Sequence, residues 1–271
     1  MTGRAATGRG RRQRRPAGSY GVGDAVRMEW IKLRSLRSTL WALMLVVVGM
    51  VGIGVATMAN TRPPSTDAAR SLFDPTNNVL AGVALGQLVI GVLGVLAVSA
   101  EYSSGTIRST FAAIPRRPMV LAAKAAVFAV VLLITGEAVC FATFFAGRAA
   151  LADDVPAPAL EEPGVLRAVV LTGAYLAQIG LIGIGLGAIA RHTAGAIGAL
   201  VAVTFVLPLI AVGLTGTTVA KFFPTLIVAN SIAVAKPVSD TLAPWTGFCV
   251  LCLYTLAALG VGGWLLNRRD A

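Results

Sequence analysis

The chain has 271 residues, of which 56% are hydrophobic and 13% are charged, and its formal net charge is +11. Soluble domains carry about 25% charged residues, so this composition excludes an ordinary soluble globular protein. Six apolar stretches approach or exceed the roughly 20 residues that a helix needs to cross a bilayer. They are Leu40–Ala59, Val79–Ala100, Val120–Ala146, Ala168–Ala190, Thr193–Leu214 and Thr246–Leu266. Because they are continuous and not alternating, they predict an all-α integral membrane protein with six spans within residues 24–271.

Residues 1–23 form a basic tail that is rich in Arg and Gly and has no apolar periodicity, so we expect it to be disordered. If both termini lie on one side, 17 of the 23 Lys and Arg lie on that side and six on the other. Positive residues stay in the cytoplasm, which predicts that both termini are inside. The polar region before Leu40 is too long for a signal peptide. We expect the tail to contact anionic lipid and not nucleic acid.

The segment Asp24–Ser38 is predicted to be a helix capped by Asp24, with Val26, Trp30 and Leu33 on its apolar face. A Trp with basic neighbours is typical of a helix that lies in the membrane interface. The candidate interfacial residues are Trp30, Lys32, Arg34 and Arg37. The alternative is that this segment simply extends the first span into the cytoplasm.

The longest polar segment between two spans on the predicted inner side is Glu101–Lys124. It begins with an acid where an apolar run stops, and it contains Gly105-Thr106 and the run Pro115-Arg116-Arg117-Pro118. Since so little of the chain is polar, we expect this segment to be the main contact with a soluble partner.

Glu137 is the only acid deep within a predicted span. An ionisable residue inside the membrane is costly, which makes it a functional candidate by default. Two interpretations are open at this stage. The carboxyl group either hydrogen-bonds to a neighbouring Thr or Gln, or it contacts a substrate, a cation or a gate.

Two further patterns concern the helices. Small residues four apart, such as Gly183 and Gly187, predict close helix packing. Residues 222–235 are apolar but too short to span, so we interpret them as a re-entrant or interfacial hairpin on the outer side. Pro208 is expected to kink the fifth span.

The sequence offers little for chemistry. It contains no GxxxxGK[ST], HExxH or GxSxG motif, so the chain is not expected to hydrolyse ATP or to be an enzyme. With one histidine, and with its three cysteines inside apolar runs, it provides no metal cluster and no catalytic residues.

From about Arg27 to Ala271, the chain resembles the type 2 permeases of ABC transporters. The resemblance rests on the six spans, the amphipathic N-terminal helix, the Glu101–Lys124 segment, the short hairpin and the closing WLLNRRDA. It implies that Glu101–Pro118 forms a coupling helix. The residues that match the family pattern, or that we expect to contact the ATPase, are Glu101, Gly105, Thr106, Arg108, Pro115, Arg116, Arg117 and Lys124.

The resemblance implies a transport subunit, most simply of an exporter, in a bacterial plasma membrane. Two permease chains, identical or related, would assemble with two ATP-binding subunits that hold the ATP and Mg. No cofactor is expected in this chain. Two other classes stay open: an ion-coupled secondary transporter or channel that uses Glu137, and a non-transporting immunity or assembly subunit.

Overall fold

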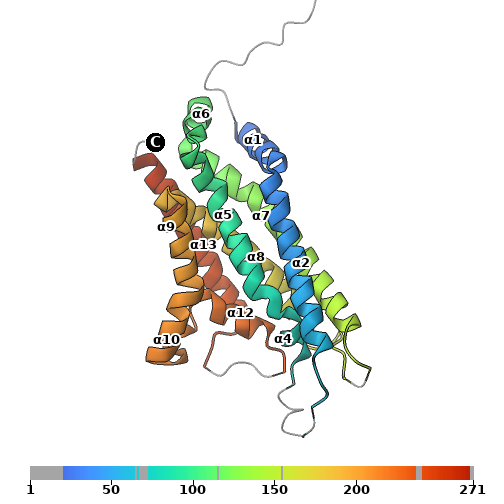
Figure 1. Ribbon diagram of the computed structural model, residues 1–271. Coiled ribbons are helices and arrows are strands. Elements are labelled where there is room, and N and C mark those ends of the chain that lie inside the picture. The colour runs from blue at the N-terminus through green and yellow to red at the C-terminus, as the bar shows by residue number, and fades with distance from the viewer. Residues whose placement is uncertain are drawn as a thin grey trace, which may run out of the picture.

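The structure is a computed structural model that describes residues 21–64, 66, 73–114, 116–153, 155–235 and 240–268. In these ranges the chain forms helices joined by turns, and no strand is present. Six helical segments are long and apolar enough to cross a membrane, as the sequence predicts. Figure 1 shows them running side by side, an architecture that fits a multi-pass membrane protein.

The helices follow each other with short connections. Their bounds are α1 (Val22–Ser35), α2 (Arg37–Ala59), α4 (Pro75–Val79), α5 (Val83–Ser103), α6 (Thr106–Ala113), α7 (Arg117–Ala149), α8 (Val165–Ala190), α9 (Thr193–Val201), α10 (Leu207–Thr215), α11 (Thr217–Ala220), α12 (Pro224–Ile232) and α13 (Pro244–Arg268). A 3-10 turn, Leu80–Gly82, continues α4 into α5, and a π-helical turn, Ala202–Val206, joins α9 to α10. Each predicted span falls within one of these helical segments, apart from the boundaries, which the structure extends by a few residues.

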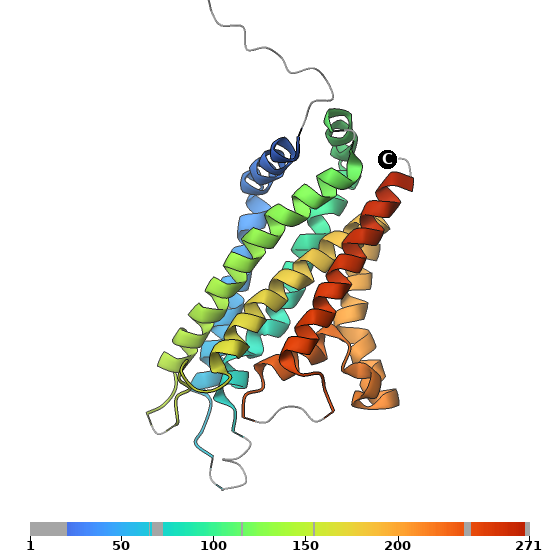
Figure 2. The ribbon, with the colours of Figure 1, turned by 180° about the vertical axis from the view of Figure 1, so that it is seen from behind.

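The bundle has two distinct ends. Helices α1 and α6 and the last turns of α13 lie at one end, which we call the α6 end (Figure 1). Helices α4 and α12 lie at the opposite end, which we call the α12 end, and the same division is seen from behind in Figure 2. The first and last described residues are therefore on the same side of the bundle.

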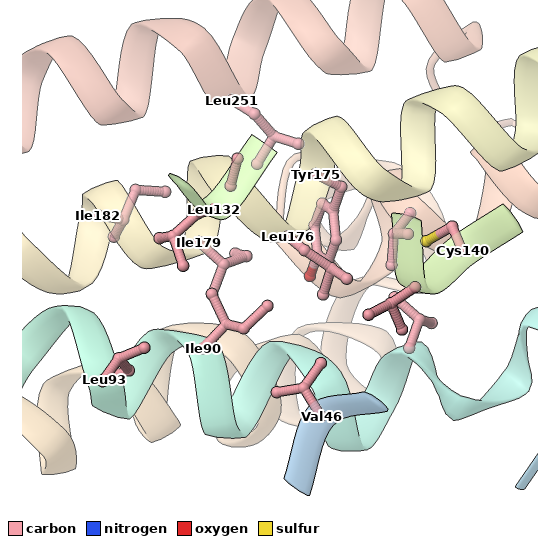
Figure 3. Close-up of a cluster of buried hydrophobic side chains, with 14 of the residues drawn as sticks. Val46, Ile90, Leu93, Leu132, Cys140, Tyr175, Leu176, Ile179, Ile182 and Leu251 are labelled. Carbon is pink, nitrogen blue, oxygen red and sulfur yellow. The ribbon is translucent and has the colours of Figure 1, made fainter. Parts of the chain in front are cut away.

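Helix α8 is the centre of the bundle. Of its most apolar window 72% is buried, against 17% for the α9–α10 segment. Side chains from α5, α7 and α8, including Ile90, Leu132 and Leu176, meet in the core shown in Figure 3. Glycines allow this close packing, because a Cβ added at Gly94 of α5 would overlap the carbonyl oxygen of Gly180 in α8. The predicted close approach at Gly183 and Gly187 of α8 is confirmed, since a Cβ at either would crowd the α5 backbone.

Helix α1 differs from its prediction in bounds and in the face that is buried. It begins at Val22, and Asp24 is not its N-cap; the Asp24 carboxylate instead accepts a hydrogen bond from the Gly21 N–H, at 3.1 Å. Residues 1–20 of the predicted tail lie outside the described residues. Helix α1 ends at Ser35, so Arg37 belongs to α2. The buried residues of α1 are Ala25, Glu29 and Leu33, whereas Trp30 is 47% exposed.

The fifth span is interrupted where Pro208 was predicted to kink it. Proline has no N–H, so the carbonyl of Thr204, four residues earlier, loses its helical donor. The backbone widens there into the π-helical turn, and the Thr225 hydroxyl of α12 donates a hydrogen bond to the Thr204 carbonyl. The short helix α12 is thereby fixed against the point where the fifth span is irregular.

Candidate functional site

Four charged side chains meet at the α6 end and join three helices. Glu29 and Lys32 come from α1, Glu101 from α5 and Lys124 from α7. The Lys124 Nζ lies 2.5 Å from Glu29 Oε2 and 2.8 Å from Glu101 Oε1. The Lys32 Nζ lies 3.0 Å from Glu29 Oε1 and 3.0 Å from Glu101 Oε1. Two ammonium groups therefore alternate with two carboxylates, and the charge of this cluster is balanced. We call it the four-charge cluster.

The burial of the four-charge cluster is uneven. The side chains of Glu29 and Lys124 are 1% and 5% exposed, whereas that of Lys32 is 31% exposed. A buried charge is tolerated only when it is paired and hydrogen-bonded, and each of these charges is. Burial alone would lower the pKa of Lys32, but the carboxylates of Glu29 and Glu101 outweigh it and raise that pKa above its ordinary value. Lys32 therefore stays charged at neutral pH.

Helix α6 is attached to the four-charge cluster. Gly105 precedes it with a φ of +72°, a left-handed conformation that glycine adopts without strain, and this turn separates α6 from α5. The Lys32 Nζ also donates to the Thr110 hydroxyl of α6, at 3.2 Å. Just after α6, Ile114 packs with Ala25 of α1 and with Val120 of α7. A displacement of α6 would therefore be transmitted to α1, α5 and α7.

The predicted coupling residues divide into those that are free to meet a partner and those held inside the chain. Arg108 and Arg116 are exposed at the α6 end, and Thr106 is exposed beside Ser104, with 2.9 Å between the two hydroxyls. Arg117, in contrast, is half-buried. Its Nη1 donates to the Leu266 carbonyl at 3.1 Å, and its guanidinium lies 5.4 Å from the centre of the Phe111 ring. Pro115 lies outside the described residues.

The sequence analysis singled out Glu101, Lys124 and Lys32 separately, and the structure brings them together. It missed Glu29, which is the most buried of the four. The available signal was the spacing of Glu29 and Lys32, three residues apart on one helix, which places the two side chains as neighbours. The other predicted interfacial residues, Arg34 and Arg37, are exposed.

Glu137 lies far from the four-charge cluster, since the rise from Lys124 to Glu137 along α7 is about 20 Å at 1.5 Å per residue. Its carboxyl group packs against Gly173 of α8, where an added Cβ would lie 2.8 Å from both carboxylate oxygens. The Glu137 Oε2 is buried and has no hydrogen-bond partner among the described residues. The expected hydrogen bond to a Thr or Gln is therefore not what this oxygen makes.

No model of a known protein family matches the sequence, and no curated protein matches it significantly. The site is therefore interpreted from its geometry and from the resemblance described above. Within the described residues, the four-charge cluster has no nucleophile activated by a base and no grouping of side chains suited to a metal. Its geometry suits a mechanical joint between helices.

Proposed function

We propose that this chain is the permease subunit of an ATP-driven ABC transporter, an exporter, in the plasma membrane of a bacterium. The observation that supports this most is the position of α6. It is a short helix at the α6 end, it carries exposed arginines, and it is linked to three other helices through Thr110 and the four-charge cluster. Such a helix can receive a force from a soluble subunit and pass it to the spans.

In this proposal α6 is the coupling helix. Arg108 and Arg116 contact acidic or carbonyl groups of an ATP-binding subunit, since a guanidinium makes forked, charge-assisted hydrogen bonds. Closure of two ATP-bearing subunits presses on α6, and Lys32 and Lys124 carry the displacement to α1 and α7. Two permease chains, identical or related, form the substrate pathway. ATP and Mg are held by the partner subunits.

The remaining parts of the chain fit the same assignment. With the α6 end in the cytoplasm, α1 lies in the inner membrane interface, and Trp30, Arg34 and Arg37 face the headgroups. Helix α12 is a re-entrant helix at the outer end of the pathway. It is too short to span, and its contact with the interrupted fifth span supports this role.

Co-purification tests the proposal. The affinity-tagged chain, purified in mild detergent from membranes of its own host cell, is expected to bring down an ATP-hydrolysing subunit. The double variant Arg108→Gln/Arg116→Gln is expected to insert normally and to lose most of that ATPase. The matched control, Arg62→Gln/Arg148→Gln, removes two exposed arginines at the α12 end and should retain it. Absence of any ATPase with the wild-type chain would contradict the proposed function.

The proposed orientation has its own test, on a background in which Cys140, Cys249 and Cys252 are replaced. A membrane-impermeant thiol reagent applied to intact cells is expected to label Asn60→Cys, at the α12 end, and not Ser109→Cys, in α6. Both positions are exposed, so access to the reagent depends on the membrane side. Labelling at Ser109 but not at Asn60 would place the α6 end outside.

A further inference from the structure

A groove runs along the seam between α2 and α5, starting at the four-charge cluster. It consists of a cavity of about 330 Å³ next to that cluster and a second one of about 490 Å³ further along the two helices. The two cavities share lining residues, so they form one continuous groove. The shared residues are Leu36, Leu96, Ala97, Ala100 and Phe128.

The length and walls of this groove suit one hydrocarbon chain. It extends along α5 from Glu101 to Leu88, a rise of about 20 Å at 1.5 Å per residue. One leaflet contributes about half of the roughly 30 Å hydrocarbon core, so the groove is as long as one leaflet is thick. Away from the four-charge cluster its walls are mostly apolar, for example Leu45 and Val92.

The end of the groove at the four-charge cluster is polar, and its accessible charge is positive. The carboxylate-bearing side chains of Glu29 and Glu101 are only 1% and 13% exposed, whereas the side chain of Lys32 is 31% exposed. The exposed hydroxyl-bearing residues Ser35 and Thr106 line the same end. An ammonium and hydroxyl groups at a membrane surface are donors for a phosphate.

We propose that this groove binds an anionic phospholipid from the leaflet at the α6 end. One acyl chain lies between α2 and α5, and the phosphate accepts hydrogen bonds from Lys32 and from the hydroxyls beside it. The lipid covers apolar wall residues that are otherwise open, such as Leu36 at 52% exposed and Leu45 at 54% exposed. The inference requires a membrane location and is independent of transport or of an ATPase partner.

Native mass spectrometry tests the site on the full chain, purified from nanodiscs of equal parts phosphatidylglycerol and phosphatidylcholine with identical acyl chains. We expect one phospholipid to stay bound through delipidation. Phosphatidylglycerol is expected to be enriched about fivefold, because one basic residue near an anionic headgroup contributes roughly 1 kcal/mol. Ala97→Phe, which fills the groove without touching the four-charge cluster, is expected to lose the bound lipid. Ala84→Phe, at an exposed position of α5 outside the groove, is the matched control and should retain it.

Each other outcome overturns a stated part of the proposal. If the wild-type chain retains no phospholipid, or if Ala97→Phe retains as much as Ala84→Phe, the groove is not a lipid site. Equal retention of the two headgroups rejects the anionic preference. If Ala97→Phe changes the oligomeric mass and not the bound lipid, a second copy of the chain occupies the groove. Comparable thermal melting of both variants rules out misfolding as the reason for lipid loss.

Discussion

Replacing Lys124 by Met is predicted to destabilise the protein strongly, because it leaves two buried carboxylates with one ammonium. Lys124 makes the closest contacts of the four-charge cluster, 2.5 Å to Glu29 and 2.8 Å to Glu101. Met has nearly the same length and fills most of the space, so the change mainly removes the charge. Lys32 would then be the only cation next to Glu29, whose side chain is 1% exposed.

The expected magnitude follows from this burial. Removing one partner of a buried ion pair costs about 3–5 kcal/mol, whereas removing an exposed charge costs about 0–1 kcal/mol. For a chain of this size, 1 kcal/mol corresponds to roughly 2–4 °C in melting temperature. Lys124→Met is therefore expected to lower the melting temperature by about 6–20 °C. Arg34→Met, which removes an exposed cation of α1, should change it by no more than about 4 °C.

Thermal melting in detergent, followed by size-exclusion chromatography, measures both variants. The combination Glu29→Gln/Lys124→Met removes one charge of each sign and is expected to recover part of the loss, a positive coupling within a double-mutant cycle. The reasoning is refuted if Lys124→Met melts like Arg34→Met, or if the double variant is less stable than the sum of its single changes.

Three further predictions concern other parts of the bundle. Thr225→Val removes the hydroxyl that caps the free carbonyl of the π-helical turn, so thermal melting should show a loss of about 1–3 kcal/mol. Gly94→Ala forces a methyl group onto the Gly180 carbonyl and should cost about 1–3 kcal/mol or more, whereas Gly198→Ala, which meets nothing within 4 Å, should not lower the melting temperature. Glu137→Gln keeps the size of the side chain and should leave folding and co-purification unchanged, but it is expected to alter transport-coupled ATPase activity.

The spans could be predicted from the sequence because a membrane helix is a property of a contiguous stretch. Length and apolar content are read along the chain, and a tertiary partner changes neither. The irregular fifth span was predictable for the same reason, since the missing N–H of Pro208 acts on its own helix. The closure of that gap by Thr225 was not, because it depends on where α12 docks.

The four-charge cluster could be predicted only in part, because its pairing is a property of the fold. Glu101 and Lys124 stood out as polar residues at the ends of apolar runs. The contact of Lys124 with Glu29 joins residues 95 positions apart, and no local spacing indicates it. Helical periodicity even pointed the wrong way, since it assigned Trp30 to the apolar face, whereas the structure buries a carboxylate that Lys124 and Lys32 neutralise.

The choice of charges at this joint has a physical consequence. Apolar side chains of similar volume would often hold such a joint as firmly, because desolvation offsets much of the attraction in a buried ion pair. Apolar packing is non-directional and tolerates small displacements between helices, whereas a hydrogen-bonded ion pair near 2.8 Å weakens steeply when its geometry changes. A joint built from ion pairs therefore holds one arrangement of α1, α5 and α7 well and intermediate arrangements poorly.

The same end of the bundle is secured by two arginines that bind the last turns of α13. Arg117, at the start of α7, donates to the Leu266 carbonyl, and Arg191, at the end of α8, donates to the Leu265 carbonyl at 3.2 Å. Helix α10 has no comparable support, since Pro208 is its only buried residue. If a load on α6 moves the spans, we expect α1, α5, α7, α8 and α13 to move together and α10 to move relative to them. The π-helical turn between α9 and α10 would then act as the hinge, because its backbone is already irregular and one hydroxyl from α12 holds it.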